Sequence, residues 1–141
     1  MRVVLDSNVL LSALIAPHGA PHALYCAWRE RRFEIITAQK QIEEIRRASR
    51  YPKFKAILQP HLVGAMLNNL QGAQIIDPMP ATQSAADPDD AFLLDLALAG
   101  DADFLVTGDH RAGLLQRSRI GRARILTPAD MNSPAAKRMA L

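Results

Sequence analysis

Short apolar runs alternate along the chain with longer segments whose apolar residues recur at helical spacing. The short runs predict strands and the periodic segments predict helices. The predicted strands are Arg2–Leu5, Phe33–Thr37, Gln74–Ile76, Asp103–Thr107 and Arg122–Thr127. The predicted helices are Ser7–Ala16, Pro21–Arg32, Ala38–Ser49, Lys53–Leu58, His61–Leu70 and Asp87–Gly100. This alternation is typical of an α/β sandwich with a mostly parallel sheet.

The size and composition of the chain predict one domain. Its 141 residues are 49% hydrophobic and 22% charged, as in ordinary globular proteins. We expect the domain to cover residues 1–131 and residues 132–141 to form a short, mobile C-terminal tail. No apolar run is long enough for a membrane span, and the N-terminus is a poor signal peptide. A single cysteine, Cys26, excludes an internal disulfide, so we expect a cytoplasmic protein without a membrane partner.

The charged residues are unevenly distributed, although the net charge is only +3. The segment between Ile45 and Ile76 has no acidic residue but several Arg and Lys residues. The segment from Asp87 to Asp109 holds seven of the 14 acidic residues and no Arg or Lys. Two solvated helix faces of opposite sign would explain this pattern, and so would a polyanion-binding surface beside an acidic pocket.

Acidic residues occur where several predicted elements meet one edge of the sheet. Asp6 follows the first strand, and Asp109 follows the fourth strand after Gly108. The sequence DPDD at positions 87–90 begins the helix before the fourth strand. Because a helix antiparallel to the strands starts at their carboxyl ends, its first turn reaches the same edge. Ligands of open α/β sheets bind at this edge.

A fourth carboxylate comes from the segment KQIEEIRRA, in the helix after the second strand. Glu43 and Glu44 are about 100° apart around the helix axis, so only one can point into a given cleft. Ile42 and Ile45 mark the inward face. The periodicity does not decide between the two glutamates.

Each acid alone has a structural explanation. Asp6 can cap the helix that follows it, and Asp87 with Pro88 makes a good helix start. Several carboxylates at one edge, however, repel each other unless a cation neutralises them. Oxygen ligands suit Mg²⁺ or Mn²⁺, and one or two such ions can promote phosphodiester hydrolysis. The set of acids therefore predicts a metal-dependent phosphodiesterase.

These residues give the chain a resemblance to PIN-domain nucleases, in particular to the VapC-like toxins of bacterial type II toxin–antitoxin systems. The matching segments are VVLDSNVLLSAL, FEIITAQKQIEEI, DPDDAFLLDLALAGDADFLVTGDHRAGLL and RILTPADM, in the family's order. The resemblance implies a three-layer, Rossmann-like α/β/α sandwich with about five strands. It also implies an acidic Mg²⁺ or Mn²⁺ pocket, cleavage of single-stranded RNA and, often, homodimers held inactive by an antitoxin protein.

The resemblance assigns a role to individual residues. Its catalytic, metal-binding acids fall on Asp6, Glu44, Asp90 and Asp109. Its supporting polar positions fall on Ser7, Asn8, Asp87 and Thr107. Candidate contacts to RNA phosphates are Arg46, Arg47, Arg50, Lys53 and Arg111.

The chain departs from the family pattern at two places. The family often has Thr at the position of Ser7, which keeps the hydroxyl group. Many members have another acid just after the fourth, where this chain has His110 and Arg111, so the number of metal ions stays open. A second function also stays open, namely a catalytically weak or inactive PIN fold that binds RNA or a protein partner.

Overall fold

The computed structural model describes residues 1–108 and 113–133 of the chain. Its strands are β1 (Arg2–Leu5), β2 (Glu34–Thr37), β3 (Gln74–Ile75), β4 (Phe104–Val106), β5 (Arg119–Ile120) and β6 (Ala123–Leu126). Its helices are α1 (Ser7–Ile15), α2 (Ala20–Arg29), α3 (Gln39–Ala48), α4 (Pro52–Lys55), α5 (Pro60–Gln71), α6 (Pro88–Ala99), α7 (Leu114–Arg117) and α8 (Pro128–Met131).

The six strands form one sheet in the order β3-β2-β1-β4-β6-β5. All neighbouring pairs are parallel except β5 and β6, which are antiparallel. The central strands β1 and β4 pair from Val3 opposite Phe104 to Leu5 opposite Val106. Because β1, β4 and β6 are parallel and in close register, their carboxyl ends form one edge of the sheet.

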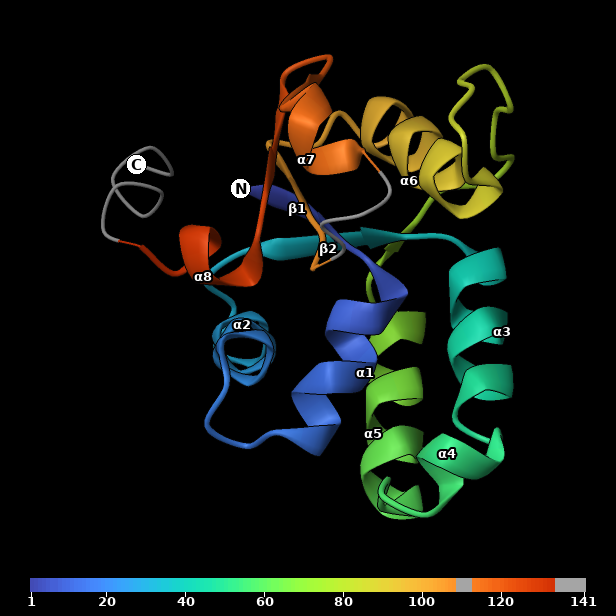
Figure 1. The fold of residues 1–141 in the computed structure, drawn as a ribbon, viewed down its shortest axis with the longest axis vertical. Helices are drawn as coiled ribbons and strands as arrows, with labels where there is room; N and C mark the ends of the chain where they lie inside the picture. Colours follow the sequence, from blue (N-terminus) through green and yellow to red (C-terminus); the bar gives the residue numbers. More distant parts are fainter. Residues whose placement is uncertain (109–112, 134–141) are drawn as a thin grey trace.

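Alternating side chains of the strands enter two separate cores. Val3 and Leu5 pack with α1, α2, α3 and α5, whereas Val4 packs with α6 and α7. Figure 1 shows the same layers, with α6 and α7 on one face of the sheet and α1, α2, α3 and α5 on the other. Both faces of the strands are buried, which explains why β1, β2 and β4 read as short, continuous apolar runs.

The predicted α/β sandwich with a mostly parallel sheet is confirmed, and the predicted strands and helices occur close to their expected positions. The short helix α7 and strand β5 were missed, and α8 forms the one helical turn that the sequence after Pro128 predicts. Strand β5 pairs with β6 through a two-residue connection at Gly121 and Arg122, with Ile120 opposite Ala123. Gly121 has a φ of +56°, the left-handed backbone that a tight hairpin requires. The sheet therefore has six strands where about five were expected.

Two further predictions concern the ends and the environment of the chain. Most of the predicted tail, residues 134–141, lies outside the described residues. Among the helices that the structure describes, none has the length and apolar character needed to cross a membrane.

Candidate functional site

Asp6 lies at the carboxyl end of β1 and is the N-cap residue of α1. Its Oδ1 accepts a hydrogen bond from the Asn8 backbone N–H at 3.1 Å. Its Oδ2 accepts a hydrogen bond from the Thr107 hydroxyl group at 3.0 Å. Its own backbone N–H donates to the Val106 carbonyl oxygen at 2.9 Å, which continues the pairing of β1 with β4. The capping role is therefore real, and the same bonds fix the orientation of the carboxylate at the edge of the sheet.

A buried polar group that sequence reasoning missed joins three elements behind Asp6. Gln41 of α3 is fully buried, and its Nε2 donates to the Leu5 carbonyl oxygen at 2.6 Å. Its Oε1 accepts from the Thr37 hydroxyl group at 2.6 Å, and its Nε2 lies 3.4 Å from the Ser7 hydroxyl group. Ser7 is thus buried at the start of α1, where Gln41 can donate a hydrogen bond to its hydroxyl group. The available signal was the position of Gln41 beside Ile42 and one turn before Ile45, on the inward face of α3.

The structure distinguishes the two glutamates of α3. Glu43 is exposed and forms an ion pair with Arg46 on the helix surface. Glu44 is half-buried, and its pKa is raised first by burial and then by the nearby carboxylates of Asp89 and Asp6. The cations of Lys40 and Arg47 act in the opposite direction without cancelling this effect. Glu44 therefore faces the carboxylates of the sheet edge, whereas Glu43 is held by a surface cation.

The first turn of α6 brings further acids to this region. Asp87 is the N-cap residue, and its Oδ1 accepts the Asp89 backbone N–H at 2.9 Å. Pro88 occupies the start of the helix, where no intrahelical N–H is needed. Asp89 is exposed and Asp90 is 4% exposed. Asp87 thus acts in the structure as a helix cap, while Asp89, which was not predicted to be a site residue, raises the pKa of Glu44 after the larger effect of burial.

The described acids converge on this edge from three elements, namely the end of β1, the middle of α3 and the start of α6. Asp109 and Arg111 lie outside the described residues, so their predicted roles stay predictions. Within residues 1–108 and 113–133, no three acidic, His or Cys side chains are close enough to hold a metal ion together.

The donors themselves fit a hard divalent cation. The groups are carboxylates, and the pKa of Glu44 is raised first by burial and then by the carboxylates of Asp89 and Asp6. A divalent cation would relieve that repulsion, and oxygen ligands are those that Mg²⁺ and Mn²⁺ prefer. The chemistry of the set therefore suits such an ion, with Asp6, Glu44 and Asp90 as the described candidates.

Cationic side chains flank the acids. Lys40 and Arg47 lie one turn before and one turn after Glu44, and both lower its pKa. The Lys40 ammonium group also lies 4.7 Å from the centre of the Phe92 ring, which links α3 to α6. Of the predicted RNA contacts, Arg47 is therefore beside the acids. Arg46 and Arg50 instead line a cavity with α4 and α5, and Lys53 lies over the Phe54 ring.

Two other acids of the acid-rich segment have structural roles. Asp95 is buried and accepts hydrogen bonds from the Thr82 backbone and hydroxyl groups and from the Gln83 backbone, at 2.8–3.1 Å. It fixes the loop before α6. Asp103 lies at the amino end of β4, where it accepts the Arg2 backbone N–H at 2.8 Å and pairs with Arg122 at 2.6 Å.

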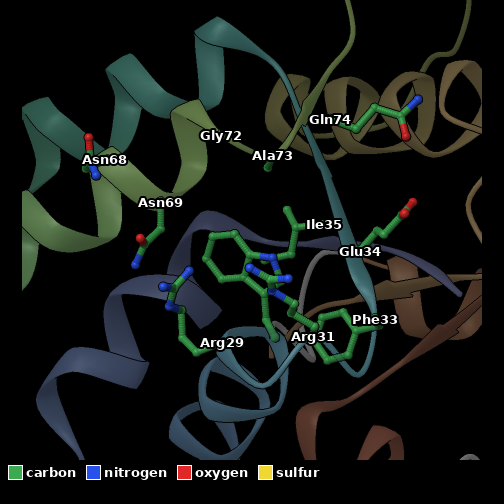
Figure 2. Close-up of a pocket in the computed structure, with 11 residues that line it drawn as sticks. Arg29, Arg31, Phe33, Glu34, Ile35, Asn68, Asn69, Gly72, Ala73 and Gln74 are labelled. Carbon is green, nitrogen blue, oxygen red and sulfur yellow. The ribbon is translucent and has the colours of Figure 1, made fainter.

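A cavity of about 800 Å³ lies elsewhere, at the amino end of β2 and between the last turns of α2 and α5. Figure 2 shows its lining, in which Arg29 and Arg31 face Asn69 across the opening and Glu34 lies at one side. None of the predicted site residues contributes to it. The cavity has side chains of both charges and lies at the opposite end of β2 from the acidic edge. We therefore assign it no role in the predicted chemistry.

Comparisons with known proteins support one family. No curated protein and no solved structure matches the chain significantly. The model of the PIN domain family matches residues 2–111, which is most of the chain and includes Asp6, Glu44 and Asp90. PIN domains are generally nucleases that act on nucleic acids with divalent metal ions. The chain belongs to the PIN domain family.

Proposed function

We propose that this protein is an Mg²⁺- or Mn²⁺-dependent endoribonuclease that hydrolyses phosphodiester bonds of single-stranded RNA. The observation that supports it most is that Glu44 is partly buried and lies near enough to Asp6 and to Asp89 of the first turn of α6 for both carboxylates to raise its pKa further. A carboxylate without a catalytic or binding role is usually held by cations or N–H groups, because uncompensated repulsion costs stability.

The residues of this edge divide the work in the proposed reaction. Asp6, Glu44, Asp90 and Asp109 would hold the divalent cation, which supplies a Lewis acid that activates water and offsets negative charge. Asp6 is held at both oxygens by the Asn8 N–H and the Thr107 hydroxyl group, so its orientation is set before substrate binds. Lys40 and Arg47 stand beside Glu44, where they can attract the phosphates of the strand.

The proposal extends to the biological setting. We infer that the protein is the toxin of a toxin–antitoxin pair, acts in the cytoplasm as a homodimer and is inhibited by an antitoxin protein. The resemblance of the ordered segments supports this part. We also retain the interpretation of residues 1–131 as one nuclease domain, because the two cores share a single sheet through the described residues.

One observation favours the alternative function, a PIN fold that binds RNA or a protein without cleaving. No three described side chains form a ready cluster for a metal ion. The alternative predicts RNA binding that does not depend on metal and no cleavage under any condition.

Cleavage of a labelled single-stranded RNA separates the two functions. The endoribonuclease should cut the RNA in Mg²⁺ or Mn²⁺, stop in EDTA, and leave 5′-phosphate and 3′-hydroxyl ends, which end-specific labelling identifies. Products with a 2′,3′-cyclic phosphate, or activity that survives EDTA, would contradict the mechanism. Binding without cleavage in either metal would favour the alternative.

A further inference from the structure

A second site on the molecule lies between α3, α4 and α5. The two longer helices run antiparallel, with Gln39 at the start of α3 hydrogen-bonded to Gln71 at the end of α5. Toward their other ends they enclose a cavity of about 350 Å³. Figure 1 shows α4 crossing below α3 and α5 at this end of the molecule. Three cations, Arg46, Arg50 and Lys55, and three apolar side chains, Leu58, Val63 and Leu67, line this cavity.

The charge at this cavity is entirely positive apart from one surface partner. Arg46, Arg50 and Lys55 line it, and no acidic residue occurs between positions 46 and 75. Arg46 pairs with the exposed Glu43. In the part of the chain that the structure describes, Arg50 and Lys55 have no ion-pair partner. The cavity therefore suits an anionic ligand.

Gly64 of α5 also lines this cavity and leaves its surface open. It lies within α5, where glycine costs about 1 kcal/mol relative to alanine. Close packing does not explain it, because a Cβ at position 64 would meet no described atom within 4 Å outside its chain neighbours and the nearby backbone of α5. The described fold therefore leaves open space at position 64, where a longer side chain could be accommodated.

The cavity is separate from the acidic edge yet close to it. Around the axis of α3, Glu44 lies on one flank of the inward face marked by Ile42 and Ile45, and Arg46 lies on the other. Arg50 is six residues beyond Glu44 and two residues beyond the end of α3 at Ala48. Tyr51, the next residue in the chain, does not line the cavity but is 53% exposed and could stack on a base.

We propose that this cavity is a phosphate-binding subsite for the RNA strand, outside the centre that cleaves it. Arg46, Arg50 and Lys55 contact one or two phosphates, and the apolar floor of Leu58, Val63 and Leu67 receives sugar or base edges. This inference rests on the proposed function for its choice of RNA. An acidic peptide with an apolar side chain also fits a cationic rim and an apolar floor. RNA is favoured because PIN domains act on nucleic acids and an exposed tyrosine stands beside the cations.

The test measures binding without cleavage. A fluorescent 12-nucleotide oligouridine is titrated with the full chain in EDTA, and its anisotropy gives the dissociation constant. Gly64→Glu places a carboxylate in the cavity while improving helix propensity, and should weaken binding about tenfold. The matched control is Ala65→Glu, which adds the same charge at an exposed position of α5 that does not line the cavity, and should weaken binding less than about twofold.

The salt dependence tests the phosphate contacts. For Arg50→Gln with Lys55→Gln, the slope of log affinity against log salt should become shallower by about 1.4, since each phosphate contact to single strands contributes about 0.7. The control is Arg117→Gln with Arg119→Gln, which removes the same charge from α7 and β5 and should leave the slope within about 0.3 of the unmodified chain.

Several outcomes would overturn the inference. Equal affinities for Gly64→Glu and Ala65→Glu would show that RNA does not enter the cavity. A labelled peptide of alternating Glu and Leu that binds the unmodified chain but not Gly64→Glu, with RNA affinity unchanged, would make the cavity a docking site for an acidic peptide. A change of oligomeric state in Gly64→Glu alone, seen by light scattering with RNA affinity unchanged, would assign it to a second copy of the chain. Since EDTA prevents cleavage, failure here is distinguishable from failure of the nuclease proposal.

Discussion

Two acids on opposite edges of the same sheet have opposite surroundings. Glu44, near the carboxyl ends of the strands, has a raised pKa because it is partly buried beside the carboxylates of Asp89 and Asp6. Asp103 lies at the amino end of β4. Burial raises its pKa, but the Arg2 N–H and the Arg122 guanidinium group outweigh that effect and leave its pKa lowered.

The difference shows how acids that stabilise the fold can be separated from acids that are candidates for binding a cation. Asp103 and Asp95 accept hydrogen bonds that tie distant segments together, and each stabilises the fold as it stands. Glu44 instead is partly buried beside the carboxylates of Asp89 and Asp6, and Lys40 and Arg47 offset only part of the resulting cost of its ionised form. The carboxyl edge of the sheet therefore carries a cost to stability that a bound cation would remove.

The largest expected effect comes from removing a carboxylate at the carboxyl edge, compared with removing one at the amino edge. Asp6→Asn should lower RNA cleavage in Mn²⁺ by about 10²–10³-fold, the loss typical of removing a group that stabilises the transition state. Asparagine is also a good N-cap, so the circular dichroism spectrum should not change. The matched control is Asp103→Asn, which should retain cleavage within about twofold at 25 °C. Equal loss in both variants would remove the distinction between the two edges.

The next effect concerns the acid that holds the loop before α6. Asp95→Ala leaves the Thr82 and Gln83 N–H groups without their carboxylate, and should lower the free energy of unfolding by about 1.5–3 kcal/mol. Urea denaturation followed by circular dichroism measures this change. Cleavage by the folded fraction should persist, because Asp95 lies outside the acidic edge. A stable but inactive variant would show that Asp95 belongs to the site.

The smallest effect is a pair of opposite pH dependences in EDTA. Because the folded pKa of Glu44 is raised, its ionisation destabilises the fold as pH rises from 4.5 through that pKa. Glu44→Gln should therefore raise the melting temperature at pH 7, with the gain vanishing below pH 4.5. Because the folded pKa of Asp103 is lowered, its stabilisation is present above pH 3.8 and is lost as pH falls through the folded pKa.

Differential scanning calorimetry between pH 3 and pH 8 reads both dependences. Asp103→Asn should lower the melting temperature at pH 7 and approach the unmodified chain in acid. If Glu44→Gln also lowers the melting temperature at pH 7, then Glu44 is a structural acid like Asp103, and the comparison fails.

The fold was largely predictable because its strands are buried on both faces. Continuous apolar runs such as that of β1 and a helix start such as DPDD are local signals that survive in the structure. Strand β5 has only two residues, and only Ile120 of these is buried, so no apolar run marks it. Its signal was the hairpin turn at Gly121, which depends on a φ that sequence periodicity does not register.

The site was predictable in part, and the limit is physical. Asp6 could be found because it directly follows a buried strand. Helix periodicity could not choose between Glu43 and Glu44, and only the resemblance pointed to Glu44, because the choice depends on which flank of α3 faces α1 and α6. Gln41 and Lys40 were missed because their partners, the Leu5 carbonyl oxygen and the Phe92 ring, are far away in sequence.

The central claim is that the carboxyl edge, and not the amino edge, binds a divalent cation. Isothermal titration of Mn²⁺ into the unmodified chain, Asp6→Asn and Asp103→Asn tests this claim most directly. We predict saturable binding to the unmodified chain and to Asp103→Asn with the same dissociation constant, and at least tenfold weaker binding to Asp6→Asn. Equal binding to all three proteins, or loss of binding only in Asp103→Asn, would contradict the account.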